Sequence, residues 1–377
     1  MTTTINNEHK KFNVPNLRFP EFQGEWEKCK LGDYGKVVTG NTPPTKDIEN
    51  YENGTYLWAS PADLGTIKSI TETKTMLSAQ GFSKTRTLPK GSVLVTCIGS
   101  TIGKTGMATK EMSTNQQINS IVVNDNNDNE FVYYAIQSAF PRYLSSIAVQ
   151  AVPIISKSAF ELLPNNRPYL QEQKKIGKFL SLLDERIATQ NKIIDKLQSL
   201  IKGIAQKIVR NNMPNVRLTE CLECKSSTLQ ESEVCEQGTY PVYGANGIVG
   251  YLDNYNTEGE AVYIIKDGSG VGTVSYVTGK CSATGTLNTL QAKEGYSLHY
   301  LYYLLKVFNF EPYKTGMAIP HIYFKDYGKA KVFCPSYTEQ LQYARLLSTI
   351  DNKLSVEKNT LRNLSLQKQY LLRQMFI

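Results

Sequence analysis

The chain has 377 residues, with 42 lysines and arginines against 34 aspartates and glutamates, and a formal net charge of +8. This length suits two or three domains, and the moderate basic excess suits a polyanionic partner without proving one. No apolar run approaches the roughly 20 residues that span a bilayer. The polar first residues do not resemble a signal peptide, and seven cysteines, an odd count, suggest free thiols in a reducing cytoplasm.

The segment "CIGSTIGKTG" (97–106) resembles a phosphate-binding loop that follows a short apolar strand. A P-loop has four residues between its first glycine and the Gly-Lys pair, so that backbone N–H groups surround the phosphates. Only three residues separate Gly99 from Gly103. The spacing therefore favours a glycine-rich turn between strands over a nucleotide site.

An internal repeat organises the chain. "AVPIISKSAF" (151–160) matches "AIPHIYFKDY" (318–327), and "PYLQEQKKIGKFLSLLDERI" (from 168) matches "PSYTEQLQYARLLSTIDNKL" (from 335), both with an offset of 167 residues. The glycine turn recurs as "DGSGVGTVS" (267–275), where Thr273 replaces Lys104. Lys104 is therefore not integral to the repeated unit, which weakens the nucleotide-binding interpretation further.

Each repeat ends in a long segment with a heptad pattern, which predicts a coiled coil. Seam residues, all apolar or aromatic except Gln190, Glu357 and Lys368, recur with alternating steps of four and three. They are Ile176, Leu180, Leu183, Ile187, Gln190, Ile194, Leu197, Ile201, Ile204, Ile208 and, in the second repeat, Tyr343, Leu347, Ile350, Leu354, Glu357, Leu361, Leu364, Lys368, Leu371, Met375. Each helix would be about 60 Å long at 1.5 Å per residue. Gln190 and Glu357 both lie near the middle of their seams, so an antiparallel pairing lets them meet.

A globular unit, a helix, a second globular unit and a second helix make a pseudo-twofold arrangement. Duplex DNA also has a twofold axis, and proteins that read two half-sites commonly mirror it. Because the two units differ in sequence, we expect the half-sites to differ as well. The helices would then act as a ruler between them.

Several motifs carry a family resemblance that covers nearly all residues from about 15 onward. They are "PNLRFPEFQGEWEKCKLGDYG" (15–35), "TGNTPPTKD" (39–47), "YLWASPADL" (56–64), "GTYPVYGANGIVGYLDNY" (238–255), the "DGSGVGTVSY" turn, and the "EQ" pairs at Glu172-Gln173 and Glu339-Gln340. The chain resembles the specificity subunits of Type I restriction-modification systems.

The resemblance implies a non-catalytic subunit of the α+β class. Two globular, β-rich α/β target-recognition domains would be separated by an antiparallel two-helix coiled coil in a pseudo-twofold repeat, and each domain would read half of an asymmetric bipartite DNA target. The helices would set the gap and dock two methyltransferase subunits, which recruit two restriction/translocase subunits. S-adenosylmethionine, ATP and magnesium would be bound only by those partners. The expected segments are a flexible N-terminal segment (1–20), the first domain (21–167), the first spacer helix (168–212), the second domain (213–334) and the second spacer helix (335–377).

Two motifs with possible chemistry are interpreted as structural. "NTPPT" (41–45) lacks the Asn/Asp-Pro-Pro-aromatic arrangement of adenine methyltransferases and suits a turn. "CLEC" (221–224) has zinc-like spacing but no second cysteine pair, so free thiols are favoured over a metal site. We expect no catalytic and no metal-binding residues.

Loops should supply the DNA contacts, with Lys and Arg on phosphates and Asn, Gln or Arg on base edges. The candidates in the first half are Thr39, Asn41, Thr42, Lys46, Lys104, Asn115, Gln116, Gln117 and Lys157. The candidates in the second half, taken as counterparts of that set, are Tyr243, Asn246, Lys266, Ser269, Thr284 and Lys325. For each of them an ordinary loop role is the alternative.

Two rival functions stay open at this point. A coiled-coil adaptor that binds only proteins would show no salt-dependent DNA binding, whereas a DNA-binding protein weakens steeply as salt rises. A nucleotide-dependent enzyme would lose ATP binding when Lys104 becomes alanine.

Overall fold

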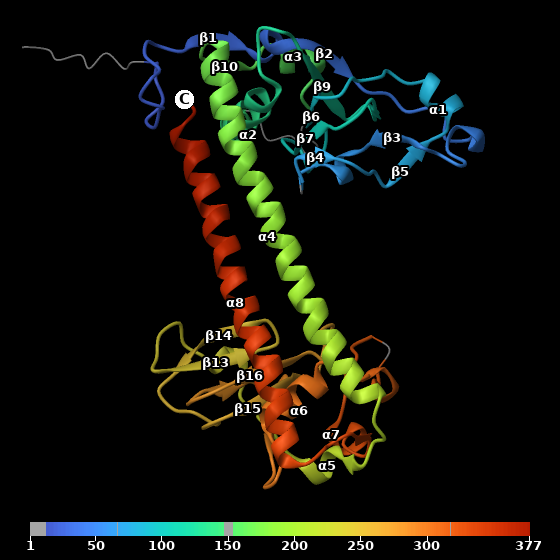
Figure 1. The fold of residues 1–377 in the computed structure, drawn as a ribbon, viewed down its shortest axis with the longest axis vertical. Coiled ribbons are helices and arrows are strands. Elements are labelled where there is room, and N and C mark those ends of the chain that lie inside the picture. Colours follow the sequence, from blue (N-terminus) through green and yellow to red (C-terminus); the bar gives the residue numbers. More distant parts are fainter. Residues whose placement is uncertain (1–12, 66, 147–153, 317) are drawn as a thin grey trace, which may run out of the picture. The chain divides into compact units, whose positions relative to one another are not determined.

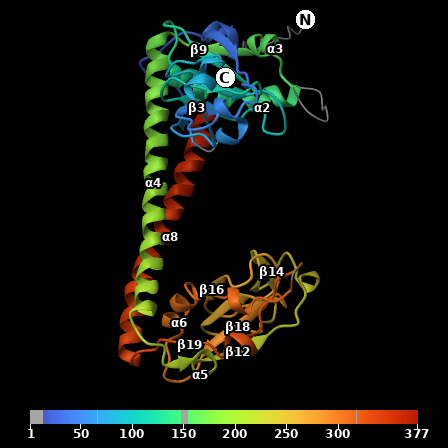
Figure 2. The same ribbon diagram turned by 90° about the vertical axis from the view of Figure 1, so that its right-hand side faces the viewer.

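The computed structural model describes residues 13–65, 67–146, 154–316 and 318–377. These residues form two compact units, which are described separately here: unit 1 runs up to Gln190 and includes Leu361–Ile377, and unit 2 is Asn191–Thr360. Two long helices, α4 (Leu170–Arg210) and α8 (Tyr337–Gln374), each contribute to both units (Figures 1 and 2). The helices that the heptads predict are therefore confirmed.

Unit 1 contains three sheets, and its globular part has three helices of its own. The strands are β1 (Glu27–Lys30), β2 (Gly35–Thr39), β3 (Tyr56–Ala59), β4 (Ser69–Ile70), β5 (Thr75–Leu77), β6 (Val93–Thr96), β7 (Thr105–Ala108), β8 (Ser113–Thr114), β9 (Ile118–Val123) and β10 (Pro164–Arg167). The helices are α1 (Ala79–Ser83), α2 (Asn129–Ser146) and α3 (Lys157–Glu161). The sheet orders are β2-β9-β6-β7-β4, β5-β3-β8 and β1-β10.

Unit 2 repeats this plan. Its strands are β11 (Val216–Arg217), β12 (Leu222–Ser226), β13 (Tyr240–Gly244), β14 (Gly247–Leu252), β15 (Ala261–Ile265), β16 (Val274–Val277), β17 (Ser282–Ala283), β18 (Leu287–Ala292) and β19 (Lys331–Val332). Its helices are α5 (Leu218–Cys221), α6 (Leu298–Leu305) and α7 (Phe324–Tyr327). The sheet orders are β12-β18-β15-β16, β14-β13-β17 and β11-β19.

The strand orders of the two units match, except that β4 of unit 1 has no counterpart among the strands of unit 2. The antiparallel series β2-β9-β6-β7 matches β12-β18-β15-β16, and the parallel pair β3 and β8 matches β13 and β17. A polar contact repeats as well: Thr39 on β2 bonds to Asn119 at 2.6 Å, and Ser226 on β12 bonds to Asn288 at 3.0 Å. The internal repeat and the α+β class are thus confirmed.

The glycine-rich segment is a turn between antiparallel strands, as predicted. Gly103 joins β6 to β7 with φ +90°, and Gly272 joins β15 to β16 with φ +89°. A Cβ on Gly103 would lie 2.6 Å from Cδ1 of Phe140, and one on Gly272 would lie 3.0 Å from Cδ2 of Phe310. Glycine is therefore required both for the left-handed backbone and for close packing on an aromatic ring.

The end of α8 packs against the start of α4 within unit 1, so the helices are antiparallel. Leu371 and Met375 share one buried core with Ile176 and Leu180. Lys368 also pairs with Asp184 at 2.6 Å. In unit 2 the heptad positions that are buried are Ile194, Ile201, Ile208, Leu347 and Leu354. The predicted pairing of Gln190 with Glu357 joins residues of different units, so it stays a prediction. The boundaries of the five expected segments also stay predictions. Residues 1–12 and Pro153 lie outside the described residues.

A buried glutamine ties each long helix to the globular part of its unit. Gln173 donates to the Pro168 carbonyl at 2.9 Å and accepts from the Asp128 N–H at 3.1 Å. Gln340 likewise donates to Pro335 at 2.9 Å and accepts from the Ser297 N–H at 2.9 Å. The accepted N–H groups stand at the starts of α2 and α6. We call these two residues the anchor glutamines.

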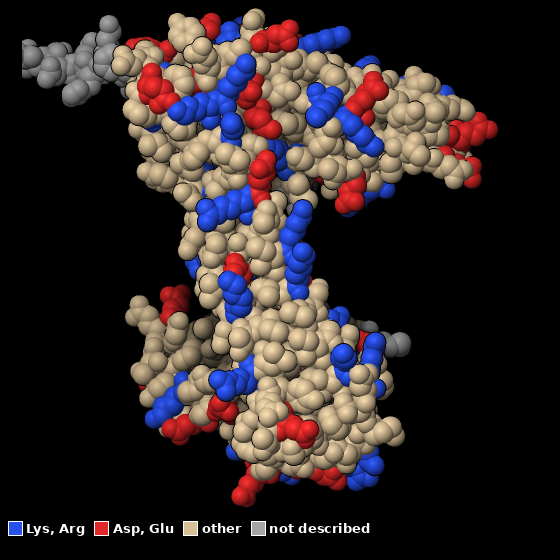
Figure 3. All heavy atoms as spheres, in the orientation of Figure 1, with Lys and Arg blue, Asp and Glu red and all other residues tan. Residues whose placement is uncertain are grey.

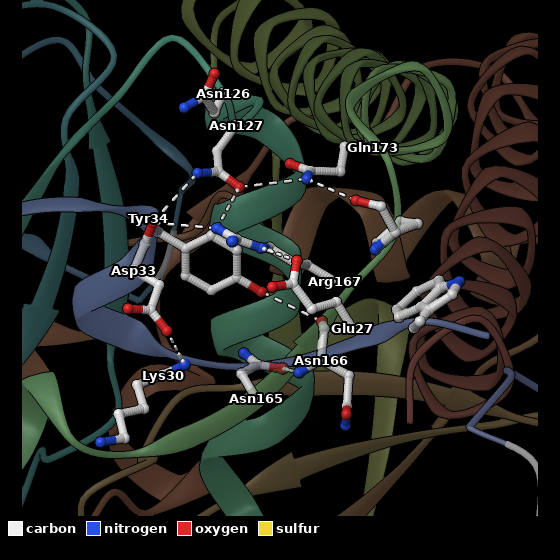
Figure 4. A network of polar contacts seen from close by, with 12 residues as sticks. Glu27, Lys30, Asp33, Tyr34, Asn126, Asn127, Asn165, Asn166, Arg167 and Gln173 are labelled. Atoms are coloured by element: carbon white, nitrogen blue, oxygen red, sulfur yellow. Dashed lines mark hydrogen bonds and ion pairs between the residues drawn. The ribbon is translucent and has the colours of Figure 1, made fainter.

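Unit 1 adds further polar contacts around its anchor glutamine (Figure 4). Gln173 also donates to Asn127 at 3.2 Å, and Arg167 reaches the Asp33 carbonyl at 3.2 Å and Glu27 at 3.2 Å. The neighbouring Glu172 is buried and receives a bidentate pair of bonds from Arg18 at 2.7 and 2.8 Å. Glu339 of unit 2 instead caps its helix by accepting from Ser336. Of the two residues in the "EQ" pair, the glutamine therefore plays the same part in both repeats, whereas the glutamate does not.

We predict that Gln340→Leu lowers the free energy of unfolding by about 1–3 kcal/mol, because it leaves the buried Ser297 N–H without an acceptor. Gln342→Leu, at an exposed position of the same helix, should change it by less than about 0.5 kcal/mol. Urea unfolding of both variants measures the difference. Equal effects would show that the anchor contact is not stabilising.

We predict that Gly103→Ala also destabilises the chain, by about 1–3 kcal/mol, because alanine is strained at this φ and would collide with Phe140. Lys104→Ala should stay within about 0.5 kcal/mol, since that side chain is exposed. Thermal unfolding of the two variants provides the comparison. A larger loss for Lys104→Ala would contradict the role given to the turn.

Candidate nucleic-acid interface

The loop after β2 holds several predicted residues in place by internal bonds. Thr39 bonds to Asn119, as described above, and Thr42 donates to Gln116. The Asn41 side chain donates to the Lys84 carbonyl at 2.9 Å and accepts from the Arg86 N–H at 2.8 Å. Because both ends of its amide are occupied, Asn41 shapes the loop in the unbound chain.

Arg86 was not predicted from the sequence, although it belongs to this cluster. Its guanidinium donates to the Thr39 carbonyl at 2.8 Å, and the residue is exposed. Arg86 lies far from the loop in the sequence, so no local motif points to it. It adds a cationic side chain beside Thr39 and Asn41.

The segment Asn115–Gln117 adjoins the same loop. Asn115 is buried and bonds to Gln117 through both its oxygen and its nitrogen at 3.0 Å. Gln116 is exposed and accepts from Thr42, and the Gln117 amide lies 3.8 Å from the Cβ position of Gly99. The structure thus brings Thr39, Asn41, Thr42 and residues 115–117 together near the glycine turn.

The three predicted lysines of unit 1 are all exposed but differ in their surroundings. Lys46 forms no ion pair among the described residues, and the Lys104 stem passes close to Gly65. Lys157 lies on α3, where it pairs with Glu161 at 3.6 Å. Figure 3 shows Lys and Arg interspersed with Asp and Glu over the globular parts rather than gathered in a single basic patch.

In unit 2 the hairpin between β13 and β14 presents Asn246 at its exposed tip. Tyr243 packs against Tyr263 with ring centroids 5.6 Å apart, and its carbonyl accepts from the Thr284 N–H at 2.9 Å. Burial raises the pKa of Tyr243, with Cys281 and Tyr251 adding to the effect. Its hydroxyl therefore stays protonated near neutral pH and can donate a hydrogen bond.

The other predicted residues of unit 2 differ in exposure. Thr284 is buried and shares a hydrogen bond with Thr286 at 2.8 Å. The half-buried Lys266 and the exposed Ser269 flank the glycine turn. Lys325, on α7, lies over the Tyr323 ring at 5.1 Å. Thr284, like Asn115, can therefore act on DNA only through the loop that it supports.

One expected correspondence between the units was wrong. The sequence comparison took Tyr243 and Asn246 as counterparts of the loop after β2, but β13 is topologically equivalent to β3. The counterpart of the loop after β2 is the loop after β12, from Ser227 onward. The two loops differ in length and composition, so a constant offset could not reveal the match.

The loop after β12 forms one wall of a groove of about 740 Å³ in unit 2. Most of the lining is polar and includes Lys225, Thr228, Gln230, Asn254 and Tyr255. Among the described residues, no hydrogen bond occupies the side chains of Thr228 or Asn254. They are free to bond to a ligand, and sequence reasoning missed this groove.

The motifs with possible chemistry have structural surroundings. Cys221 is buried with Cys334, and Cys224 lies on β12, whereas Cys235 is exposed elsewhere in unit 2. Burial raises the pKa of Cys97, beside the glycine turn, to about 12. Over the described ranges, no cluster of three or more His, Cys, Asp or Glu side chains is arranged to hold a metal ion. None of the helices searched in those ranges is both long and apolar enough to cross a bilayer.

Comparison with known proteins identifies the family. The profile of the "Type I restriction modification DNA specificity domain" family matches residues 23–199 and 211–365. The chain is 28% identical over 214 residues to the HindI specificity subunit of Haemophilus influenzae, covering 55% of this chain and 42% of that protein. It is 30% identical over 182 residues to the MjaIX specificity subunit of Methanocaldococcus jannaschii, covering 46% and 42%. The matched region thus spans less than half the length of these curated relatives.

A solved structure shows the same fold across nearly the whole chain. The S subunit of a Type I restriction-modification system from M. genitalium superposes with a TM-score of 0.68 at 21% identity, covering 97% of this chain and 99% of that one. The family profile matches one segment in each repeat, which agrees with the duplicated strand order. The chain therefore belongs to the family of Type I restriction-modification specificity subunits.

Proposed function

We propose that this chain is a non-catalytic subunit that reads an asymmetric bipartite DNA target, with one half-site for each globular unit. The observation that carries the proposal is duplication with divergence: both units share one strand order, yet the loops after β2 and β12 differ in sequence. A shared scaffold with different loops suits two readers of different base sequences, because base-edge contacts come from individual side chains.

The anchor glutamines support the part of the proposal that concerns the gap. Each one ties the first turns of a long helix to the backbone of its globular unit through a buried amide. A tether of this kind keeps the reading loops at a constant position relative to the helix. The helices then set the number of base pairs between the half-sites.

Partner subunits would supply the chemistry. Several large apolar side chains on the long helices are exposed, namely Leu182, Ile193, Leu200, Val356, Leu366 and Tyr370. Exposed apolar residues of this kind suit protein contacts. We propose that these side chains dock two methyltransferase subunits, which bind S-adenosylmethionine. Two restriction/translocase subunits, which depend on ATP and magnesium, would join the complex through the methyltransferase subunits.

We predict that adenine-methylation mapping, in cells that express the chain with its methyltransferase partner, yields one asymmetric bipartite motif with a constant gap. Cells that express the methyltransferase alone are the control. A complex that forms but methylates no new motif would contradict the proposal and favour the adaptor alternative.

We predict that the double variant Thr228→Ala/Asn254→Ala relaxes one half of that motif and leaves the other half and the gap unchanged. Each lost base contact should reduce discrimination by about 1–3 kcal/mol. The matched control is Thr338→Ala/Asn352→Ala at exposed positions of α8. Methylation maps of both variants make the comparison, and changes in both halves would refute the assignment of one half-site to unit 2.

A further inference from the structure

A basic stripe runs along the outer face of α4 in unit 2. It consists of Lys192, Lys196, Ser199, Gly203, Lys207 and Arg210, which recur in steps of three and four. All six residues are exposed. At 3.6 residues per turn they lie within about 80° of one another around the helix. The buried seam residues Ile194, Ile201 and Ile208 lie on the opposite side. We call this surface the outer stripe.

The four cations of the outer stripe are not neutralised by the chain. Among the described residues, none of Lys192, Lys196, Lys207 and Arg210 forms an ion pair; the only acid close to the stripe in the helix is Asp195, at its edge. Lys207 and Arg210 stand in the last turn, where cations also stabilise a helix. Lys192 and Lys196 stand mid-helix, where that explanation does not apply.

Gly203 is a second, independent observation on the same stripe. Glycine inside a helix costs about 1 kcal/mol relative to alanine, and the missing Cβ lets another backbone or a ligand come close to the helix. A Cβ on Gly203 would meet nothing within 4 Å. The described residues therefore give no packing reason for the glycine, and the space beside it is open to a partner.

The stripe is not a requirement of the repeat. The equivalent positions of α8, 167 residues later, are Asn359, Asn363, Leu366, Tyr370 and Gln374. None of them is charged, and Tyr370 occupies the place of Gly203 with 59% of its surface exposed. An exposed helix position in this fold thus accepts a large side chain, so the small residue on α4 has its own cause.

The spacing of the cations suits a duplex. Two cation pairs, Lys192 with Lys196 and Lys207 with Arg210, have centres about 22 Å apart at 1.5 Å per residue, and small neutral residues lie between them. The phosphate strands of DNA border a major groove about 12 Å wide. The stripe has cations at both ends and small, uncharged residues in its centre. This arrangement suits binding across a groove that is bordered by two phosphate strands. It suits a continuous acidic surface less well.

We propose that the outer stripe of α4 binds the phosphate backbone of duplex DNA, independently of its sequence, with Ser199 and Gly203 allowing the backbone to approach. The inference rests on the proposed DNA-reading function and adds to it a contact outside the globular units. The stripe would increase affinity and leave the half-site preference to the loops.

The test uses the full chain in complex with its methyltransferase and a mixed-sequence duplex as the probe. In the variant K192Q/K196Q/K207Q/R210Q, the slope of log affinity against log salt should fall by about 2–4, because each lost phosphate contact removes about 0.9. The control K202Q/K358Q/R362Q/R373Q makes the same change in net charge at exposed positions outside the stripe. Its slope of log affinity against log salt should stay close to that of the wild type.

A second variant tests close approach without changing charge. Gly203→Tyr should fold with an unreduced melting temperature, because no described residue lies within 4 Å of a Cβ at this position, and should bind the duplex several-fold more weakly. The proposal is overturned if both variants bind as the wild type does. It is also overturned if the stripe variant loses the methyltransferase while retaining its salt slope, which would assign the stripe to an acidic protein surface. A wild-type complex without salt-dependent binding would instead refute the proposed function itself.

Discussion

The structure depends on one buried amide in each repeat. Gln173 and Gln340 each use both ends of the side chain. Each donates to a proline carbonyl just before a long helix and accepts from the backbone N–H of the residue that precedes α2 or α6. A buried amide that loses a partner costs about 1–3 kcal/mol, so one placement of helix and globular unit satisfies all the groups. In the proposed function, a ruler built from helices works only if the reading units are fixed to it, and these two residues would provide that attachment.

The rest of the molecule can vary around this attachment. The repeated strand order carries different loops in the two units, and the helices carry different outer faces. Contacts conserved between the repeats, such as Tyr134 with Asp184 and Tyr303 with Asp351, lie between globular unit and helix. The loops after β2 and β12 differ between the repeats, as do the outer faces of α4 and α8. Under the proposed function, the shared scaffold is thus separated in space from the loops that would read the bases.

The sequence predicted the fold best in segments that carry a periodic pattern or belong to the internal repeat. The heptads predicted α4 and α8 because seam residues that are buried or half-buried impose the period. The paired glycine turns indicated that Lys104 is not integral to the repeated unit. The site was predicted less well. The equivalence of the loops after β2 and β12 depends on strand pairing across many residues, and Arg86 joins Asn41 only through the tertiary fold. The role of the "EQ" pairs also became clear only from burial, which separates the anchoring Gln340 from the exposed capping Glu339.

Hydroxyl-radical footprinting of the chain with its methyltransferase, on DNA that carries the methylated motif, tests the central claim most directly. Two readers at a constant separation should protect the backbone around both half-sites, and lengthening the gap by one base pair should abolish protection of at least one half. Protection that survives any change of the gap would show that the two units bind independently, and the account of a reader attached to a ruler would then be wrong.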